Sequence, residues 1–510
     1  MNGRTIAKRL VLLAGAGALS AAPGSVRADD DAHASEARAA TLALDVRRAH
    51  EVLDHADATD PAIALERARL AIYDGDYDAA AALLSRADLQ RSDAGAELFA
   101  IASGSARATA AAVTEVDTTR GVTIRMQDES DRPLAPFLVD VAVAAREALL
   151  RDLKVDLPRP LHIELVRDLF TLSAMTGLPE SAAQKTGTVA VAKWGRVTMI
   201  SPRAISRGYP WADTLAHEMA HLAQTCASGD RAPLWLQEGV AKREETRWRA
   251  SRNLDDFPGA DVIAAIGVER KLAPPIDKLG GSIALLPTAQ EAMIAFAEVA
   301  SFIRFFVKST GDDALAELLL GLRTARGNEF VDEALKVVTG ASLADWNARW
   351  IGYLGTVKRD LPPGTTLGGD LPHEPEIRRG LVLGELLRRR THPGAAKTVL
   401  GPAQKLAPFD PLLRHRLASA LFALGEQAEA EKLINRMEDV HSEFGPWFSL
   451  HGRWLLSQGR MDEGAASFRA GLQLCPLDPE VACEEKMPPE VPDTPNQAPL
   501  CQAARSARQD

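Results

Sequence analysis

Basic residues, aromatic residues and long apolar stretches are all scarce in this sequence. Lys and Arg number 59 against 69 Asp and Glu, so the formal net charge is −10 at pH 7. A surface of this sign disfavours nucleic acid and anionic membranes as partners. Aromatic residues make up 5 % of the chain. Their scarcity, beside abundant alanine and leucine, favours helix over sheet. After residue 28 no apolar stretch is long enough to cross a bilayer.

The first 28 residues have the order of a secretory signal peptide. A basic segment at 4–9 precedes an uncharged apolar stretch at 10–22, and residues 26–28 fit a cleavage site. The apolar stretch is short for a membrane helix, and an uncleaved anchor is the alternative. We therefore expect export through a cleavable signal peptide into the periplasm or the extracellular space, with no membrane span after cleavage. Cleavage takes the net charge from −10 to −14, because four basic and no acidic residues are lost.

Both ends of the mature chain are predicted to be helical, with small residues at a regular spacing. Gly425 and Gly459 lie 34 residues apart. The same step separates the members of two further series, which are Leu387, Leu421 and Leu455, and Ala396, Ala430 and Gly464. This period resembles tetratricopeptide (TPR) repeats, in which small residues let the two helices of a hairpin pack closely. We expect about three such units at the C-terminus and one or two around Gly75, with a plain helical bundle as the alternative.

The four cysteines are Cys226, Cys475, Cys483 and Cys501, and their spacing does not match a zinc ribbon. The proline-rich segment between Cys483 and Cys501 cannot form a core of its own. We expect a disulfide between these two cysteines, which would hold the last helix against the repeats. Cys226 is expected to be a small buried hydrophobe rather than a metal ligand.

The segment most informative about chemistry is 217–221, with the sequence HEMAH. On a helix, His217 and His221 lie one turn apart on the same face, where both imidazoles can bind one metal ion. Glu218 lies about 100° further round, beside the ion rather than on it. From there it can accept a proton from a zinc-bound water. Asp213 is the expected N-cap of this helix.

A third ligand is available seventeen residues after His221. The sequence WLQEGVA at 235–241 predicts a second helix, from which Glu238 projects. Hydrolytic zinc sites use three protein ligands and leave one position open. The predicted Zn²⁺ ligands are therefore His217, His221 and Glu238.

Residues 120–358 resemble the peptidase MA-like gluzincin family of metallopeptidases. The resemblance rests on the two segments above, on the strand expected at 196–201, and on helices expected at 300–306 and 346–354. It implies an α+β fold class: a gluzincin-type zinc peptidase domain with a small mixed sheet and helices, flanked by α-helical TPR-like segments. It also implies that Glu218 is the general base, and that the strand 196–201 borders a cleft where a peptide could pair by strand addition.

Alternation of apolar and polar residues predicts strands at 122–126 and 161–166, with a helix between them at 134–153. A hairpin is expected to turn at Trp194-Gly195. The predicted division of the chain is a signal peptide at 1–28, an N-terminal helical TPR-like segment at 29–115, a gluzincin-like metallopeptidase domain at 116–358, a linker at 359–375, and C-terminal TPR-like repeats and tail at 376–510.

The chain departs from the family pattern at two places. Relatives often carry a tyrosine after the third ligand that stabilises the oxyanion, whereas Phe296 stands there in this sequence. Tyr209 is the candidate catalytic substitute, and the loss of one such donor costs about 10²- to 10³-fold in rate. Lys242 stands where some relatives carry an acid that supports a ligand, so that support is either missing or supplied elsewhere. Lys193 and Arg196 near the cleft hint at acidic substrates.

The predicted function is that of an exported zinc metallopeptidase, which hydrolyses peptide bonds by means of a zinc-bound water activated by Glu218. The alternative is a catalytically weak or inactive zinc-binding domain that serves, with its TPR-like repeats, as a protein-interaction scaffold. The expected partners are a peptide or protein substrate and a protein bound to the repeats.

Overall fold

The computed structural model describes residues 28–205, 209–251, 255–272, 274–276, 279, 283, 286–325, 330–367, 373–435, 444–484 and 497–506. The predicted signal peptide lies outside these ranges except for its last residue, and so it stays a prediction. Among the described helices, none combines the length and the apolar character that crossing a membrane requires.

The N-terminal helices include a hairpin at the predicted position. They are α1 (Ala28–Leu42), α2 (Val46–Asp54), α3 (Pro61–Asp74), α4 (Tyr77–Leu84), α5 (Ala87–Gln90) and α6 (Asp93–Thr109). The Asp60 carboxylate caps α3 by accepting the backbone N–H groups of Ala62 and Ile63. Gly75 ends the same helix with φ at 78°, a left-handed conformation that suits glycine. The chain then turns back into α4.

One five-stranded sheet follows, in the order β1-β2-β3-β5-β4. Its strands are β1 (Val113–Asp117), β2 (Val122–Met126), β3 (Leu161–Val166), β4 (Ala190–Lys193) and β5 (Arg196–Ile200). The three inner strands run parallel, and both edge strands are antiparallel to their neighbours. The predicted strands 122–126 and 161–166 are confirmed, as is the hairpin turn, where Trp194 and Gly195 have φ of 57° and 69°. The strand β1 was not predicted.

The strand expected at 196–201 is present, but its place in the sheet differs from the one that a pairing peptide would need. It was expected to offer an edge to a peptide, but β5 pairs with β3 on one side and with β4 on the other. The free edge beside it belongs to β4. Strand order is set by contacts between distant segments, and the alternation within one strand does not reveal it.

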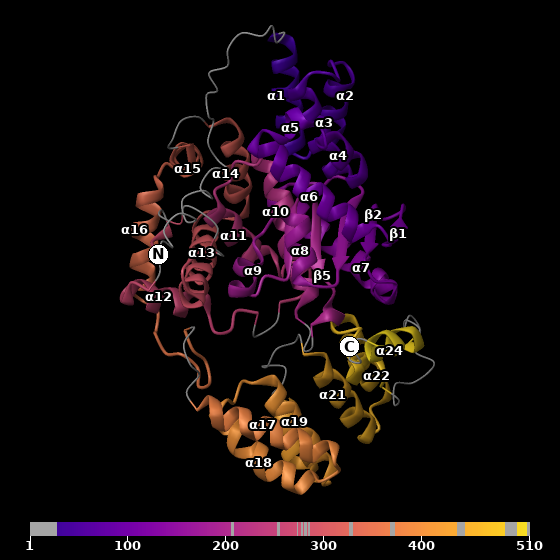
Figure 1. Ribbon diagram of the computed structural model, residues 1–510. Coiled ribbons are helices and arrows are strands. Elements are labelled where there is room, and N and C mark those ends of the chain that lie inside the picture. Colours follow the sequence, from indigo (N-terminus) through magenta and orange to yellow (C-terminus); the bar gives the residue numbers. More distant parts are fainter. Residues whose placement is uncertain are drawn as a thin grey trace, which may run out of the picture.

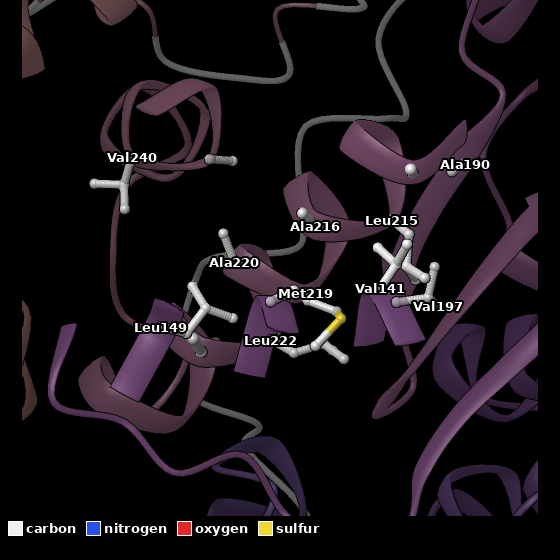
Figure 2. Packing of buried hydrophobic residues seen from close by; sticks show 14 of the residues in the cluster. Val141, Leu149, Ala190, Val197, Leu215, Ala216, Met219, Ala220, Leu222 and Val240 are labelled. Atoms are coloured by element: carbon white, nitrogen blue, oxygen red, sulfur yellow. The ribbon is translucent and has the colours of Figure 1, made fainter. Parts of the chain in front are cut away.

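The remaining helices of the central part cover the sheet and form the main core. They are η1 (Glu129–Leu134), α7 (Ala135–Leu153), α8 (Leu169–Thr176), α9 (Glu180–Thr186), η2 (Pro202–Ala204), α10 (Trp211–Ser228), α11 (Leu234–Glu244), α12 (Ala260–Arg270), α13 (Ala289–Thr310), α14 (Asp312–Thr324), α15 (Phe330–Thr339) and α16 (Leu343–Leu354). Figure 2 shows Leu215 of α10 beside Val141 of α7 and Val197 of β5. The apolar face of α10 is thus buried against both layers.

The predicted fold class, α+β with a gluzincin-type domain, is wrong. Helix accounts for 69 % of the residues that the structure describes, and the sheet is a single small layer of five short strands. The alternation that produces strands is confined to residues 113–200, whereas the alanine- and leucine-rich segments on both sides bury one stripe of each helix. The molecule is therefore mainly helical.

Three helical hairpins, which follow one another at the predicted 34-residue step, and two further short helices form the C-terminal part. The helices are α17 (Glu374–Arg389), α18 (Pro393–Leu406), α19 (Pro411–Ala423), α20 (Gln427–Asn435), α21 (Gly445–Ser457), α22 (Met461–Leu474), α23 (Pro479–Ala482) and α24 (Gln497–Ser506). A residue with positive φ follows the first helix of each hairpin, at Thr391, Gly425 and Gly459. A Cβ on Gly452 would lie 2.6 Å from the Phe468 ring, so α21 and α22 pack more closely than any larger residue allows.

One core crosses the boundaries that were predicted between domains. The cluster that contains the sheet and α10 also includes Tyr73 of α3 and Phe468 of α22. The indole N–H of Trp211, the first residue of α10, donates to the Leu474 carbonyl at 2.8 Å. In Figure 1 α22 and α24 lie beside the end of the central part, where α24 packs on η1, whereas α17 and α18 lie further away. The predicted disulfide between Cys483 and Cys501 is present.

Candidate metal centre

The three predicted ligands come together from two helices. On α10, His217 Nε2 and His221 Nε2 lie 3.3 Å apart. On α11, Glu238 Oε2 lies 3.5 Å from His217 Nε2 and 3.7 Å from His221 Nε2. All three side chains are about 15 % exposed, so the group is recessed but reachable from solvent.

This triangle has the size that a tetrahedral zinc ion requires. Bonds of about 2.0–2.2 Å around a tetrahedral ion separate neighbouring ligand atoms by about 3.3–3.6 Å. Two observed separations, 3.3 and 3.5 Å, lie in this range, and the third, 3.7 Å, lies just above it. Two imidazole nitrogens and one carboxylate oxygen are also a donor set that suits zinc. Within the described ranges, no other group of three such side chains lies close enough to hold an ion.

A glycine explains why Glu238 lies where it does. A Cβ on Gly239 would meet Ile303 Cγ1 at 2.5 Å and the Val299 carbonyl oxygen at 2.7 Å, both on α13. Only glycine lets α11 approach α13 this closely. One turn earlier, Trp235 packs edge-on against Phe302 of the same helix. The WLQEGVA sequence therefore fixes α11 on α13 and presents Glu238 to the histidines.

The carboxylate that holds the imidazole ring of His217 belongs to Glu245, which was not among the predicted residues. His217 Nδ1 lies 3.1 Å from Glu245 Oε2, and Lys242 Nζ donates to the other oxygen of Glu245 at 2.6 Å. A carboxylate at Nδ1 leaves Nε2 as the nitrogen that faces the ion. The spacing in the sequence could have indicated this residue. Glu245 follows Glu238 by seven residues, which is two turns, and so lies on the same helix face.

The carboxylates around His217 determine its charge. Burial lowers the pKa of His217, but hydrogen bonds with Glu238 and Glu245 outweigh burial and raise the pKa to about 10. Burial alone would raise the pKa of Glu238, yet its electrostatic interaction with His221 and the hydrogen bond with His217 lower it overall. A proton on the histidine therefore balances the acids. A metal ion would take over that role, so binding a metal releases a proton.

The predicted base lies beside the triangle and is held by the sheet. Glu218 is 8 % exposed, and its Oε2 accepts the backbone N–H of Ala192 in β4 at 2.6 Å. Among the described residues, Oε1 has no hydrogen-bond donor. It is therefore the oxygen that can accept a proton. The same contact brings the outer edge of β4 next to the base.

Two positions were considered for an oxyanion donor, Tyr209 and Phe296. The hydroxyl of Tyr209 donates to the carbonyl oxygen of Ile200, at the end of β5. Burial raises the pKa of Tyr209 well above its ordinary value, so the hydroxyl stays protonated. Phe296 is partly buried against the main core and has no hydrogen-bonding group. The catalytic role of Tyr209 stays a prediction.

The predicted cap of the motif helix is wrong. α10 begins at Trp211, after Pro210, so Asp213 lies inside the first turn instead of before it. Its carboxylate accepts from Arg249 at 2.6 Å and from the indole N–H of Trp248 at 2.8 Å. This tertiary partner outweighs the local preference of aspartate for a cap.

The hint of acidic substrates is also wrong for the two residues that suggested it. Arg196 is 2 % exposed and donates to Glu164 at 2.8 Å and to the Ile72 carbonyl at 3.0 Å. Lys193 donates to the Thr176 carbonyl at 2.9 Å. Both charges stabilise the interior, and the first ties the N-terminal helices to the sheet.

Comparisons with known proteins add little to this picture. No protein-family model matches the sequence, and no curated protein matches it. Among solved structures, it is similar to a chain in the crystal structure of the APC/C hetero-tetramer Cut9-Hcn1, with 14 % identity over 94 % of this chain and 96 % of that one. The TM-score is 0.20, which carries no argument about fold or function. The case for function therefore rests on the residues themselves.

Proposed function

We propose that this chain is a zinc-dependent hydrolase of peptide bonds. The observation that carries the proposal is the triangle of His217, His221 and Glu238, whose edges of 3.3–3.7 Å match a tetrahedral ion. The carboxylate of Glu218 next to it completes the set of groups that a hydrolytic site of this kind requires.

The residues around the proposed ion each have a definite task. Bound zinc supplies a Lewis acid that polarises a carbonyl and makes water more acidic. Glu218 accepts the proton of the attacking water at Oε1 and passes it to the leaving amine. The Ala192 N–H fixes this carboxylate through Oε2, and Glu245 fixes the ring of His217.

A peptide is the substrate class that the surroundings favour. Among the described strands β4 lies at the edge of the sheet, and the hydrogen bond from its Ala192 N–H to Glu218 places that edge beside the base. A peptide that adds to β4 as a further strand would therefore run past the three ligands.

The test combines metal analysis with peptide hydrolysis. Protein purified without added metal should contain about one zinc ion per chain, and His217→Ala should lose it. The wild type should cleave a mixed peptide pool, a chelator should stop cleavage, and zinc should restore it. Glu218→Gln should bind zinc and fail to cleave. No zinc after dialysis against zinc contradicts the site, and cleavage by Glu218→Gln contradicts the mechanism.

A second candidate is a zinc-binding module of low activity that serves as a scaffold with its repeats. The observation in its favour is that the hydroxyl of Tyr209 is bonded to the Ile200 carbonyl, while Phe296 carries none. An oxyanion would then lack a side-chain donor. Full zinc occupancy with no cleavage of any peptide in the pool would favour this reading.

We also propose that the protein is exported. The basic, apolar and small-residue order of residues 1–28 supports it. The disulfide between Cys483 and Cys501 supports it too, since such bonds persist in oxidising compartments. N-terminal sequencing of the cell-free or periplasmic fraction should give a chain that begins at residue 29, and recovery from the cytoplasm with residue 1 intact contradicts the proposal.

A further inference from the structure

A cluster of ion pairs joins the C-terminal repeats to the short segment that follows them. Glu480 Oε2, on α23, lies 2.7 Å from Arg416 Nη1 on α19. Its other oxygen lies 3.6 Å from Arg388 Nη2 on α17. Four residues later, Glu484 Oε2 accepts from Arg453 Nε on α21 at 2.8 Å. Three guanidinium groups, one from the first helix of each repeat, thus meet two carboxylates from one segment.

The repeat register explains why that segment lies there. The first helices of the second and third repeats begin at Pro411 and Gly445, which are one 34-residue step apart. The next step is Pro479, where α23 begins. α23 has four residues only and lies against α21. The segment 478–484 therefore takes the place of the first helix of a fourth repeat, without forming one.

The described first helices of the repeats bring few acids to this face, since α19 and α21 contain none. Glu385 is the acid that α17 contributes, and it already lies within 3.0 Å of Arg388, Arg389 and Arg416. Glu480 and Glu484 add two carboxylates, so that three acids face the four arginines of the cluster. Burial would raise the pKa of Glu480, but the hydrogen bond from Arg416 and the nearby positive charges lower it to about 2.

We propose that the arginine face, defined as Arg388, Arg416 and Arg453, is a docking site for acidic peptide segments of a partner protein, occupied here by the chain's own segment 478–484. The charge complementarity of Glu480 and Glu484 identifies the partner's chemistry as two carboxylates about one helical turn apart. The side chains of Arg388 and Glu480 are 30 % and 27 % exposed, so a competing carboxylate can reach them. The proposal is independent of the metal centre.

The chain's own segment holds the site through burial and tethering as well as through its carboxylates, because Val481 and Ala482 are buried in the main core. The segment is attached to α22 by its backbone and to α24 through the Cys483–Cys501 disulfide. A tethered ligand acts at an effective concentration in the millimolar range, so a free peptide with the same contacts competes poorly. Weakening the tethered carboxylates should therefore expose the site, and removing an arginine should destroy it.

The experiment measures fluorescence anisotropy of a labelled peptide that copies residues 477–484, with serine in place of Cys483, on the full-length chain. The variant Glu480→Gln/Glu484→Gln should bind this peptide at least ten times more tightly than the wild type does. Adding Arg416→Gln to that variant should abolish the gain. A peptide with lysine in place of its two glutamates should not bind to any of the proteins.

A matched control and a second arginine variant keep the test decisive. Arg378 is an exposed arginine of α17 outside the face, so Arg378→Gln in the double variant should leave peptide binding unchanged. If Arg416→Gln disturbs folding, as seen in its thermal transition, the more exposed Arg388→Gln replaces it and should weaken binding at least tenfold. Equal binding by the wild type and the double variant, or full binding after loss of either arginine, overturns the proposal.

Discussion

At the scale of single residues, Glu245 determines how His217 meets a metal ion. Its carboxylate lies 3.1 Å from Nδ1 and so directs Nε2 toward the other ligands. We expect Glu245→Ala to weaken zinc binding about 10- to 100-fold, as is usual when such a partner is lost. Titration against a chromogenic chelator measures the change. Glu245→Gln can still accept a hydrogen bond and should retain most of the affinity, and an unchanged affinity in Glu245→Ala would show that the contact is incidental.

Glu298 on α13 gives a second prediction at this scale, because it is buried without a partner. It is 2 % exposed, and no described residue bonds or pairs with it. Burial raises the pKa of Glu298 from its ordinary 4.5 to about 8. The folded state therefore keeps a proton that the unfolded state loses between pH 4.5 and 8. The contribution of this bound proton to the free energy of unfolding is full below pH 4.5. It is lost as the pH rises to 8, by about 1.4 kcal/mol per pH unit.

Glu298→Gln should remove this dependence, since glutamine does not titrate. Urea unfolding of both proteins at several pH values between 4.5 and 8 gives the difference directly. The variant should gain stability relative to the wild type as the pH rises. A difference that does not change with pH would mean that Glu298 is ionised in the folded protein.

At the scale of elements, the contact between α11 and α13 positions the third ligand. We expect Gly239→Ala to lower the free energy of unfolding by about 1–3 kcal/mol, because its Cβ would meet a backbone oxygen that cannot move aside. Zinc affinity should fall as well, since α11 must shift and Glu238 with it. Chemical unfolding and chelator titration measure the two effects. Gly352→Ala is the control, because nothing lies within 4 Å of its added Cβ.

The sequence indicated local elements well and their assembly less well. The strands at 122–126 and 161–166, the hairpin at Trp194-Gly195 and the 34-residue step all follow from short-range patterns. The sheet order, with β4 at the edge, depends on pairing between distant segments and was not readable. The predicted fold class was wrong because a metal motif on two helices does not determine the share of helix in the whole chain, which the alanine- and leucine-rich composition does favour.

In the candidate site, too, residues with a local spacing pattern were predicted, and contacts between distant segments were not. The sequence predicted His217, His221 and Glu238 from two helical spacings and one donor set, and the structure brings these three side chains together. Glu245 was not predicted, although its seven-residue spacing from Glu238 puts it on the same helix face, because its contact with His217 joins two different helices. The burial of Arg196 could not be foreseen, since its partners Glu164 and Ile72 come from other elements.

At the scale of the whole molecule, the three predicted segments share one core. Tyr73 and Phe468 belong to the same buried cluster as α10, although they lie outside residues 116–358. We therefore expect a fragment of residues 116–358 to lack a cooperative thermal transition and to bind zinc at least tenfold more weakly than the full chain. Circular dichroism on heating and elemental analysis decide the matter. A fragment that melts cooperatively with one zinc bound would show that the helices on both sides are accessory.

The hydrogen bond from Trp211 to Leu474 spans 263 residues of sequence. During synthesis the proposed zinc ligands emerge long before the helix that supports the start of α10. Until α22 has been made and packed, the motif helix lacks its partner at that end. The order of the chain therefore delays completion of the centre until nearly all of the protein has been made. An enzyme that cuts peptide bonds would gain from this delay, because its own unfolded chain is the first substrate that it meets.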